Sequence, residues 1–486
     1  MEIKFEEQNI NCLSSVMHRN LSQEQTQQIR LGEDMPDIGT VLGAWGKALI
    51  RTKQWRDNAM QVTGGIMVWV LYLSEGENTP YCVEDWIPWQ MKWDIPQTQQ
   101  DGYMVILPTV KSVDARALSA RKLMVRANIL CDGNGLQEKT YCVYSPDQIP
   151  ADVNLLTAEY PLMIPKEAGE RVVEIQEDIS KPLGKILRYD LSFCVTEQRI
   201  MASRMIFRGK GKLYILHLQD GKVQSFTQEL DFAQYADLDG EYTPAASGIV
   251  MPILTSLELT QGEDKWILKA QMAAQYVVFD RKMVMLAEDA YSNLREISPQ
   301  EGGLQIPHIL DQRNQQENIM IPFDVQALEV ADVSSNLWMS CANGTSLVQG
   351  LCQLLYYDHE GMLRCVSSSI EEERNLHADS DVDLSVILEG IEIMTHPAGG
   401  KVQVTVASNC MFCAASKETL SMVKGLKVSE TYVQKESRPS LIVERFSGDR
   451  LWDVAKACGS TVSAIRQANG IETEPEQGRM LLIPIG

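Results

Sequence analysis

The hydrophobic pattern of the chain recurs three times. In each copy an apolar run leads into a polar turn that ends in glycine. The copies cover residues 62–76, 206–221 and 346–361. Tyr72, His217 and Tyr357 hold matching positions in them, at spacings of 145 and 140 residues. A recurrence at a nearly constant period indicates internal repeats.

A second pattern has the same period. After Lys122, Lys265 and Lys401, apolar side chains occupy alternate positions, so that they share one face of an extended chain. These lysines lie 143 and 136 residues apart. Alternation with a period of two is typical of a half-buried strand. Two markers with one period predict a triplicated β unit.

Residues 37–430 show little helical periodicity and many short strand patterns separated by Gly, Asp and Asn turns. They predict a mainly β fold with three tandem antiparallel domains that are sandwich-like or barrel-like. The expected domains are residues 37–150, 168–292 and 313–430. The joints between them, and the next at 431–439, are rich in Pro, Gly, Gln and Glu. Residues 1–36 are polar and Gln-rich, and we expect a short helix or an arm packed on the first domain.

The C-terminal residues 440–486 change to helical spacing. Apolar residues spaced for one helix face follow Asp449 and stop at Gly459, which suits a helix C-terminus. Thr461 is expected to cap a second helix that ends at Asn469 and Gly470. Two short apolar runs flank the helices, at residues 441–443 and 480–483. The predicted order is β-α-α-β.

Composition narrows the range of functions. The chain has 486 residues and a formal net charge of −21, from 44 Lys and Arg against 65 Asp and Glu. This balance argues against a nucleic-acid surface, which needs clustered cations, and against an anionic membrane. No basic and apolar leader opens the chain, and its longest apolar run is the eight residues Ile66–Leu73. We therefore expect a cytoplasmic protein without an integral membrane span. The eleven scattered cysteines fit a reducing compartment.

Catalytic chemistry is weakly represented in the sequence. No phosphate-binding loop has the required spacing, and the six histidines form no metal-like pair. We expect no catalytic residues, no metal and no cofactor, and hence a protein that is not an enzyme. The alternative is a glycosidase-type pair of catalytic carboxylates, because so acidic a chain contains many carboxylate pairs.

Six of the nine tryptophans lie in the first repeat. They are Trp45, Trp55, Trp69, Trp86, Trp89 and Trp93. Large aromatic residues fill the cores of small β domains, so we expect most of them to be buried. The alternative for Trp86, Trp89 and Trp93, which flank Pro88, is a set of exposed interface anchors.

The C-terminal pattern resembles a LysM domain. The matching residues are Gly448-Asp449-x-Leu451-Trp452-x-x-Ala455, Thr461, Ile465, Asn469-Gly470-Ile471, Gly478 and Leu482-Ile483-Pro484. The resemblance implies a shallow groove for N-acetylglucosamine-containing glycans, formed by two turns. The candidate binding residues are Gly448, Asp449, Arg450, Leu451, Trp452, Asn469, Gly470 and Ile471. Arg450 stands where threonine is usual in the family.

The three repeats are similar to the SPOCS domain of sporulation proteins. The first repeat carries the resemblance, with a leader at residues 30–38, the apolar segment that contains Tyr72, and an Arg- and Lys-containing segment at 116–122. Repeats two and three match less closely. His217 replaces the usual tyrosine in repeat two, and neither repeat has a clear Arg- and Lys-containing segment before Lys265 or Lys401.

Tandem SPOCS domains followed by one LysM domain resemble the SipL-like spore coat morphogenetic proteins. This resemblance implies a scaffold that helps coat proteins to encase the forespore, working from the mother-cell cytoplasm at the forespore surface. It also implies that the LysM domain docks to a SpoIVA-like coat morphogenetic ATPase. The alternative is a protein that binds peptidoglycan or its precursor through N-acetylglucosamine.

Overall fold

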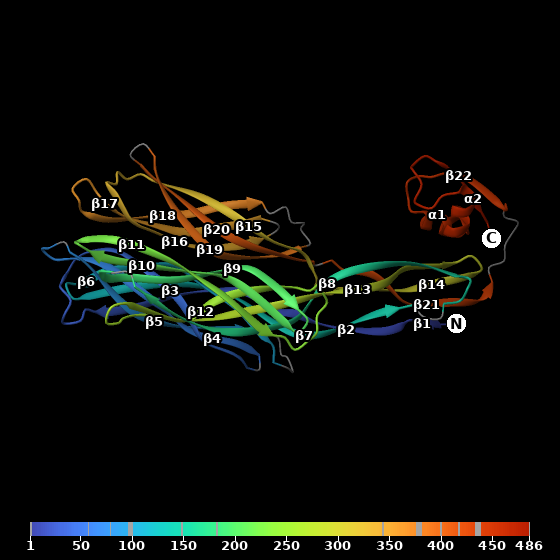
Figure 1. The fold of residues 1–486 in the computed structure, drawn as a ribbon. Coiled ribbons are helices and arrows are strands. Elements are labelled where there is room, and N and C mark those ends of the chain that lie inside the picture. Colours follow the sequence, from blue (N-terminus) through green and yellow to red (C-terminus); the bar gives the residue numbers. More distant parts are fainter. Residues whose placement is uncertain are drawn as a thin grey trace.

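The fold was analysed in a computed structural model. The structure describes residues 2–485 except 57, 78, 96–100, 147–148, 181–182, 343–344, 376–381, 399–400, 417 and 433–438. The expected mainly β, antiparallel fold is confirmed, since strands dominate and every strand pairing is antiparallel in the part of the chain described. The molecule is elongated, and its N-terminus and C-terminal module lie at the same end (Figure 1).

One six-strand motif occurs three times. Repeat 1 comprises β2 (Glu6–Arg30), β3 (Ile38–Arg56), β4 (Ala59–Ser74), β5 (Pro80–Asp94), β6 (Tyr103–Ser119) and β7 (Lys122–Ser145). Repeat 2 comprises β8 (Val153–Ile179), β9 (Lys185–Met201), β10 (Arg204–Gln219), β11 (Lys222–Asp237), β12 (Ser247–Gln261) and β13 (Trp266–Ser292). Repeat 3 comprises β15 (Ile309–Phe323), β16 (Glu329–Ala342), β17 (Thr345–Tyr357), β18 (Leu363–Asn375), β19 (Val382–Ala398) and β20 (Lys401–Ser416).

Each motif forms two sheets. The second, third and fourth strands make a meander, as in β3-β4-β5, β9-β10-β11 and β16-β17-β18. The first strand of each repeat pairs with the sixth, which also pairs with the fifth. The sheets formed in this way by repeats 2 and 3 join through β8 and β15, where Met163 lies opposite Ile309.

The two sequence markers fall at equivalent places in the motif. Tyr72, His217 and Tyr357 lie in β4, β10 and β17, the middle strands of the three meanders. Lys122 and Lys401 begin β7 and β20, and Lys265 immediately precedes β13. A middle strand has partners on both edges, which is why its apolar run is the longest signal in each repeat.

The N-terminal residues form strands, not the short helix offered as one expectation. β1 (Glu2–Lys4) pairs with β21 (Leu420–Tyr432), and β2 pairs with β7 from Glu6 opposite Ser145 to Arg30 opposite Lys122. Most side chains of β2 are exposed, so the strand carries little apolar pattern. An edge strand can form its backbone hydrogen bonds without an apolar pattern in its sequence.

The expected joints between domains contain regular structure where they are described. β8 starts inside the first joint at Val153, and β14 (Arg295–Leu304) occupies much of the second and pairs with β21. Most of the third joint, residues 433–438, lies outside the described residues. The division into domains therefore stays a prediction.

The meanders of the three repeats share cores. β4 is buried on both faces, with Val68 and Val70 in the core of repeat 1. On its opposite face, Trp69 and Leu71 join a cluster that also contains most of the core of repeat 2 and Leu355 of repeat 3. The meanders lie in stacked layers in the half of the molecule away from the C-terminal module (Figure 1). Because β4 is buried on both faces, the repeats are not separate globular units.

The tryptophans of repeat 1 divide between these cores. Trp45, Trp69, Trp89 and Trp93 are buried, while Trp55 and Trp86 are partly buried. The guanidinium of Arg51 lies 4.5 Å from the centre of the Trp86 ring. The tryptophans act mainly as core, and Trp86 is the one among the candidate anchors that retains some exposure.

A buried ion pair joins the repeats at their meeting point. Arg188 of β9 lies 3.5 Å from the carboxylate of Asp332 on β16, and both side chains are less than a tenth exposed. Tyr214 of β10 donates a hydrogen bond to Asp332 at 2.5 Å. The Arg188 guanidinium also faces the Trp45 ring of β3 at 4.9 Å and the Tyr214 ring at 4.8 Å. Repeats 1, 2 and 3 each contribute to this cluster.

Removing one partner of the pair is expected to destabilise the chain strongly. Asp332→Ala leaves a buried cation without its counter-charge, which costs about 3–5 kcal/mol, whereas a double change to Arg188→Met and Asp332→Leu removes both charges and costs less. Urea unfolding followed by circular dichroism measures the free energy of unfolding of the single and the double variant. A loss below about 1 kcal/mol for Asp332→Ala would contradict the buried pair.

Candidate functional site

The C-terminal module consists of β22 (Leu441–Arg445), α1 (Leu451–Cys458), α2 (Val462–Asn469) and β23 (Met480–Pro484). The helix ends agree with the sequence expectation. Thr461 accepts a hydrogen bond from the Ala464 backbone N–H at 3.1 Å, and Gly459 and Gly470 close the helices with φ of 70° and 60°. Positive φ at these positions suits glycine, which has no Cβ to clash.

The first predicted binding turn forms part of the module's framework. Gly448 has φ of 104°, and Asp449 accepts a hydrogen bond from Ser447 at 2.5 Å. Arg450 makes no side-chain cap to α1, and the carboxylate of Glu474 accepts instead from the Leu451 N–H at 2.9 Å. An anion at a helix N-terminus satisfies an otherwise unpaired donor there.

The second predicted turn is also structural. The side chain of Asn469 donates to the carbonyls of Ile465 at 2.8 Å and Leu482 at 2.6 Å, and it accepts from the Leu482 N–H at 2.8 Å. Asn469 therefore ties the end of α2 to β23. Ile471 is only partly buried and packs on the core of the module.

Leu451 and Trp452 point inward. The core of the module also contains Ala455, Ile465 and Ile483, and it extends to Tyr291 on β13. The Trp452 and Tyr291 rings meet edge to face, with centres 4.7 Å apart and planes inclined by 69°. The hydroxyl of Tyr291 donates to the Ser460 carbonyl at 3.0 Å. The module is thus docked on the far end of β13.

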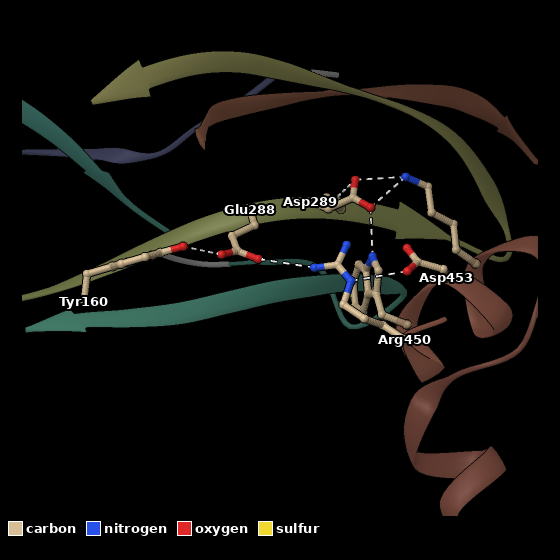
Figure 2. Close-up of polar contacts among 8 residues, drawn as sticks. Tyr160, Glu288, Asp289, Arg450 and Asp453 are labelled. Atoms are coloured by element: carbon tan, nitrogen blue, oxygen red, sulfur yellow. Dashed lines mark hydrogen bonds and ion pairs between the residues drawn. The ribbon is translucent and has the colours of Figure 1, made fainter. Parts of the chain in front are cut away.

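Asp289 is the polar centre of the docking contact. Its carboxylate accepts from the Trp452 indole N–H at 2.8 Å and from the Lys456 ammonium at 2.7 and 2.9 Å (Figure 2). Burial alone would raise the pKa of Asp289, but the hydrogen bonds from Lys456 and Trp452 outweigh it and lower the pKa. The ionised carboxylate is therefore the docked form.

Glu288, the neighbouring residue, faces the module as well. It accepts from Tyr160 of β8 at 2.5 Å and lies 3.6 Å from the guanidinium of Arg450, which also bonds Asp453 at 3.2 Å (Figure 2). The hydrogen bond to Glu288, followed by burial, raises the pKa of Tyr160 to about 12. Consecutive strand residues normally face opposite sides of a sheet, whereas Glu288 and Asp289 both face the module.

A β-bulge accounts for this arrangement. The pairing of β13 with β8 shifts register between Ala287 and Asp289, so Glu288 has no partner across the ladder. A bulge adds twist and redirects side chains, which lets two adjacent carboxylates meet one surface. Sequence reasoning missed Glu288, Asp289 and Tyr291, because they lie about 160 residues from their partners and carry no local motif.

The predicted site residues therefore fall into two groups. Arg450 and Trp452 come together in the docking contact with β13. Gly448, Asp449, Leu451, Asn469, Gly470 and Ile471 serve the module's own turns, helix ends and core. Their role in ligand binding stays a prediction.

A different surface of the module is open. β22 and β23 pair antiparallel, with Val443 opposite Leu482. Leu481 and Ile483 face inward, whereas the other face carries four large apolar side chains that are 40–57% exposed: Leu441, Val443, Met480 and Leu482. We call this face the outer face of the module. Arg445 lies on the same face, opposite Met480. Several large apolar side chains exposed on one face of a small domain are typical of an interaction site.

No family model, no curated protein and no solved structure matches this chain. Among the described residues, both helices are eight residues long, and neither has the length or the apolar character needed to cross a bilayer.

Loss of the central carboxylate is expected to loosen the docked module. Asp289→Ala removes the acceptor of both Trp452 and Lys456, and the loss of a charged hydrogen bond corresponds to about a ten-fold shift toward the undocked state. Hydrogen–deuterium exchange of peptides covering residues 283–292 and 450–461 measures it. Asp264→Ala, at an exposed turn, is the matched control. Unchanged protection in Asp289→Ala would contradict the contact.

Docking is also expected to weaken in acid. The pKa of Asp289 is lower in the docked state than its ordinary value of about 3.9. The ionised carboxylate therefore stabilises the docked module fully at pH values above about 3.9. This stabilisation is lost as the pH falls below about 4 through the lowered pKa. Protection of the same peptides between pH 3 and pH 7 tests this, with β4 peptides reporting on global unfolding. An identical pH profile in Asp289→Ala would assign the effect to other groups.

Proposed function

We propose that this protein is a non-enzymatic scaffold for spore coat assembly, a SipL-like protein with three SPOCS repeats and one LysM domain. It would act in the mother cell at the forespore surface and dock through the C-terminal module to a SpoIVA-like ATPase and to other coat proteins. Support comes from the threefold six-strand motif and from the β-α-α-β module whose helix ends fall at the residues that carry the LysM resemblance.

The outer face of the module is the observation that carries the proposal. Its four exposed apolar side chains suit burial against another protein, since transfer of apolar area from water drives association. A polar acetamido sugar would gain little from such a face. The face also lies on the two-stranded sheet, away from the residues that hold the module on β13.

The distribution of charge along the chain also supports docking through the C-terminal module. The module carries five basic and six acidic residues, a net charge of −1, so residues 1–439 carry −20. A nearly neutral module approaches an acidic coat protein with little repulsion, whereas the strongly acidic repeats stay solvated. Linked binding surfaces on one chain also raise the effective concentration of their partners.

A charge placed on the outer face is expected to abolish docking. Val443→Glu puts a carboxylate at the centre of the apolar surface, and we expect at least a ten-fold loss of affinity for the purified SpoIVA-like ATPase. Surface plasmon resonance with the full-length chain measures it. Gln467→Glu, exposed on α2, adds the same charge elsewhere and should bind normally.

Two outcomes would contradict the proposal. One is equal affinity of Val443→Glu and the unmodified chain. The other is clear calorimetric binding of chitin oligomers together with no binding of the ATPase, which would favour the peptidoglycan-binding alternative. Asn469→Ala is unsuited to this comparison, because Asn469 holds α2 to β23 and its loss would disturb the fold.

A further inference from the structure

A cavity of about 520 Å³ lies where the three repeats meet. Trp45 and Lys47 of β3 line it from repeat 1, Arg188 of β9 and Lys212 of β10 from repeat 2, and Asp332 and Ser335 of β16 from repeat 3. These strands belong to the stacked half of the molecule, at the opposite end from the C-terminal module (Figure 1). The volume lies within the range of small-molecule sites, which are often found between domains.

Arg188 lines this cavity and has one side-chain donor without a partner in the described part of the chain. Its side chain is more than nine-tenths buried, and one of its terminal nitrogens lies 3.5 Å from Asp332. The rings of Trp45 and Tyr214 hold the guanidinium in place. The Nε–H of Arg188 has no hydrogen-bond partner among the described residues. A buried charged donor without a partner is costly, so an acceptor that reached this N–H would be stabilised by it.

The rest of the lining complements an anion that also carries hydroxyls. The Ser335 hydroxyl is likewise buried without a described partner. The lining contains three cations, Lys47, Arg188 and Lys212, and two anions, Asp190 and Asp332, so its net charge is +1 in a chain of −21. Lys47 and Asp190 already pair at 2.9 Å, as do Arg188 and Asp332 at 3.5 Å, so Lys212 supplies the excess charge.

We propose that this cavity binds a small hydroxylated carboxylate, such as a sugar acid. Its carboxylate would accept a hydrogen bond from the Arg188 Nε–H and face the ammonium of Lys212. One of its hydroxyls would bond Ser335. Because the lining comes from all three repeats, the bound molecule would hold them together and raise the stability of the whole array.

Calorimetry with three probes tests the proposal on the full-length chain. Glucuronate supplies a carboxylate and hydroxyls, glucose supplies hydroxyls alone, and inorganic phosphate supplies charge alone. We expect glucuronate to bind with at least ten-fold higher affinity than glucose or phosphate, and to raise the thermal unfolding midpoint with increasing concentration. No binding of glucuronate, or equal binding of glucose or of phosphate, would overturn the proposal.

Variants then locate the site without disturbing the Arg188–Asp332 pair. Lys212→Gln and Ser335→Ala should each weaken glucuronate binding, by about ten-fold for the loss of the charge and less for the hydroxyl. Lys265→Gln is the matched control, because Lys265 pairs with Asp178 at an exposed position away from the cavity. Equal weakening by Lys265→Gln, or unchanged affinity in Lys212→Gln, would place the bound probe elsewhere and overturn the proposal.

Discussion

The buried pair of Arg188 and Asp332 is the constraint on which the rest of the architecture depends. A guanidinium this deeply buried needs a counter-charge, and its partner stands on a different repeat. Trp45 of repeat 1 covers the guanidinium, and its indole N–H donates to Ser334 on β16 at 2.7 Å. The pair and Trp45 together connect the three repeats, and the pair also neutralises two buried charges.

The sheets around this pair connect the three repeats to one another and to the C-terminal module. Each repeat completes one of its two sheets by returning its sixth strand beside its first, and the middle strand of the first meander is buried on both faces. The long strands β8 and β13 then leave the stacked meanders and carry the docking residues to the module. A strand rises about 3.3 Å per residue, so strands of this length span tens of ångströms.

The sequence predicted what local pattern encodes. Alternation and recurring apolar runs located the middle strands and the strands after Lys122, Lys265 and Lys401, and the residues Gly459, Thr461 and Gly470 marked the helix ends. The pairing of β2 with β7 could not be found in this way, because β2 is polar and owes its place to backbone hydrogen bonds with a distant strand.

The docking contact and the outer face lay beyond sequence reasoning for different physical reasons. Glu288 and Asp289 reach the module through a bulge, which depends on how two strands pair rather than on either segment alone. The short strands around Val443 and Leu482 read as uniformly apolar runs, so their sequence does not distinguish the inward side chains from the exposed ones. The same fold thus gives the module one surface that is occupied by β13 and one surface that is open.

The three repeats are expected to form one cooperative body that carries a docked module. Differential scanning calorimetry tests this most directly, by comparing the van't Hoff enthalpy of the repeats with their calorimetric enthalpy. Shared burial of β4 and the Arg188–Asp332 pair predict one transition in which the two enthalpies agree. Separate transitions for the three repeats, with a van't Hoff enthalpy near one third of the calorimetric total, would contradict the account.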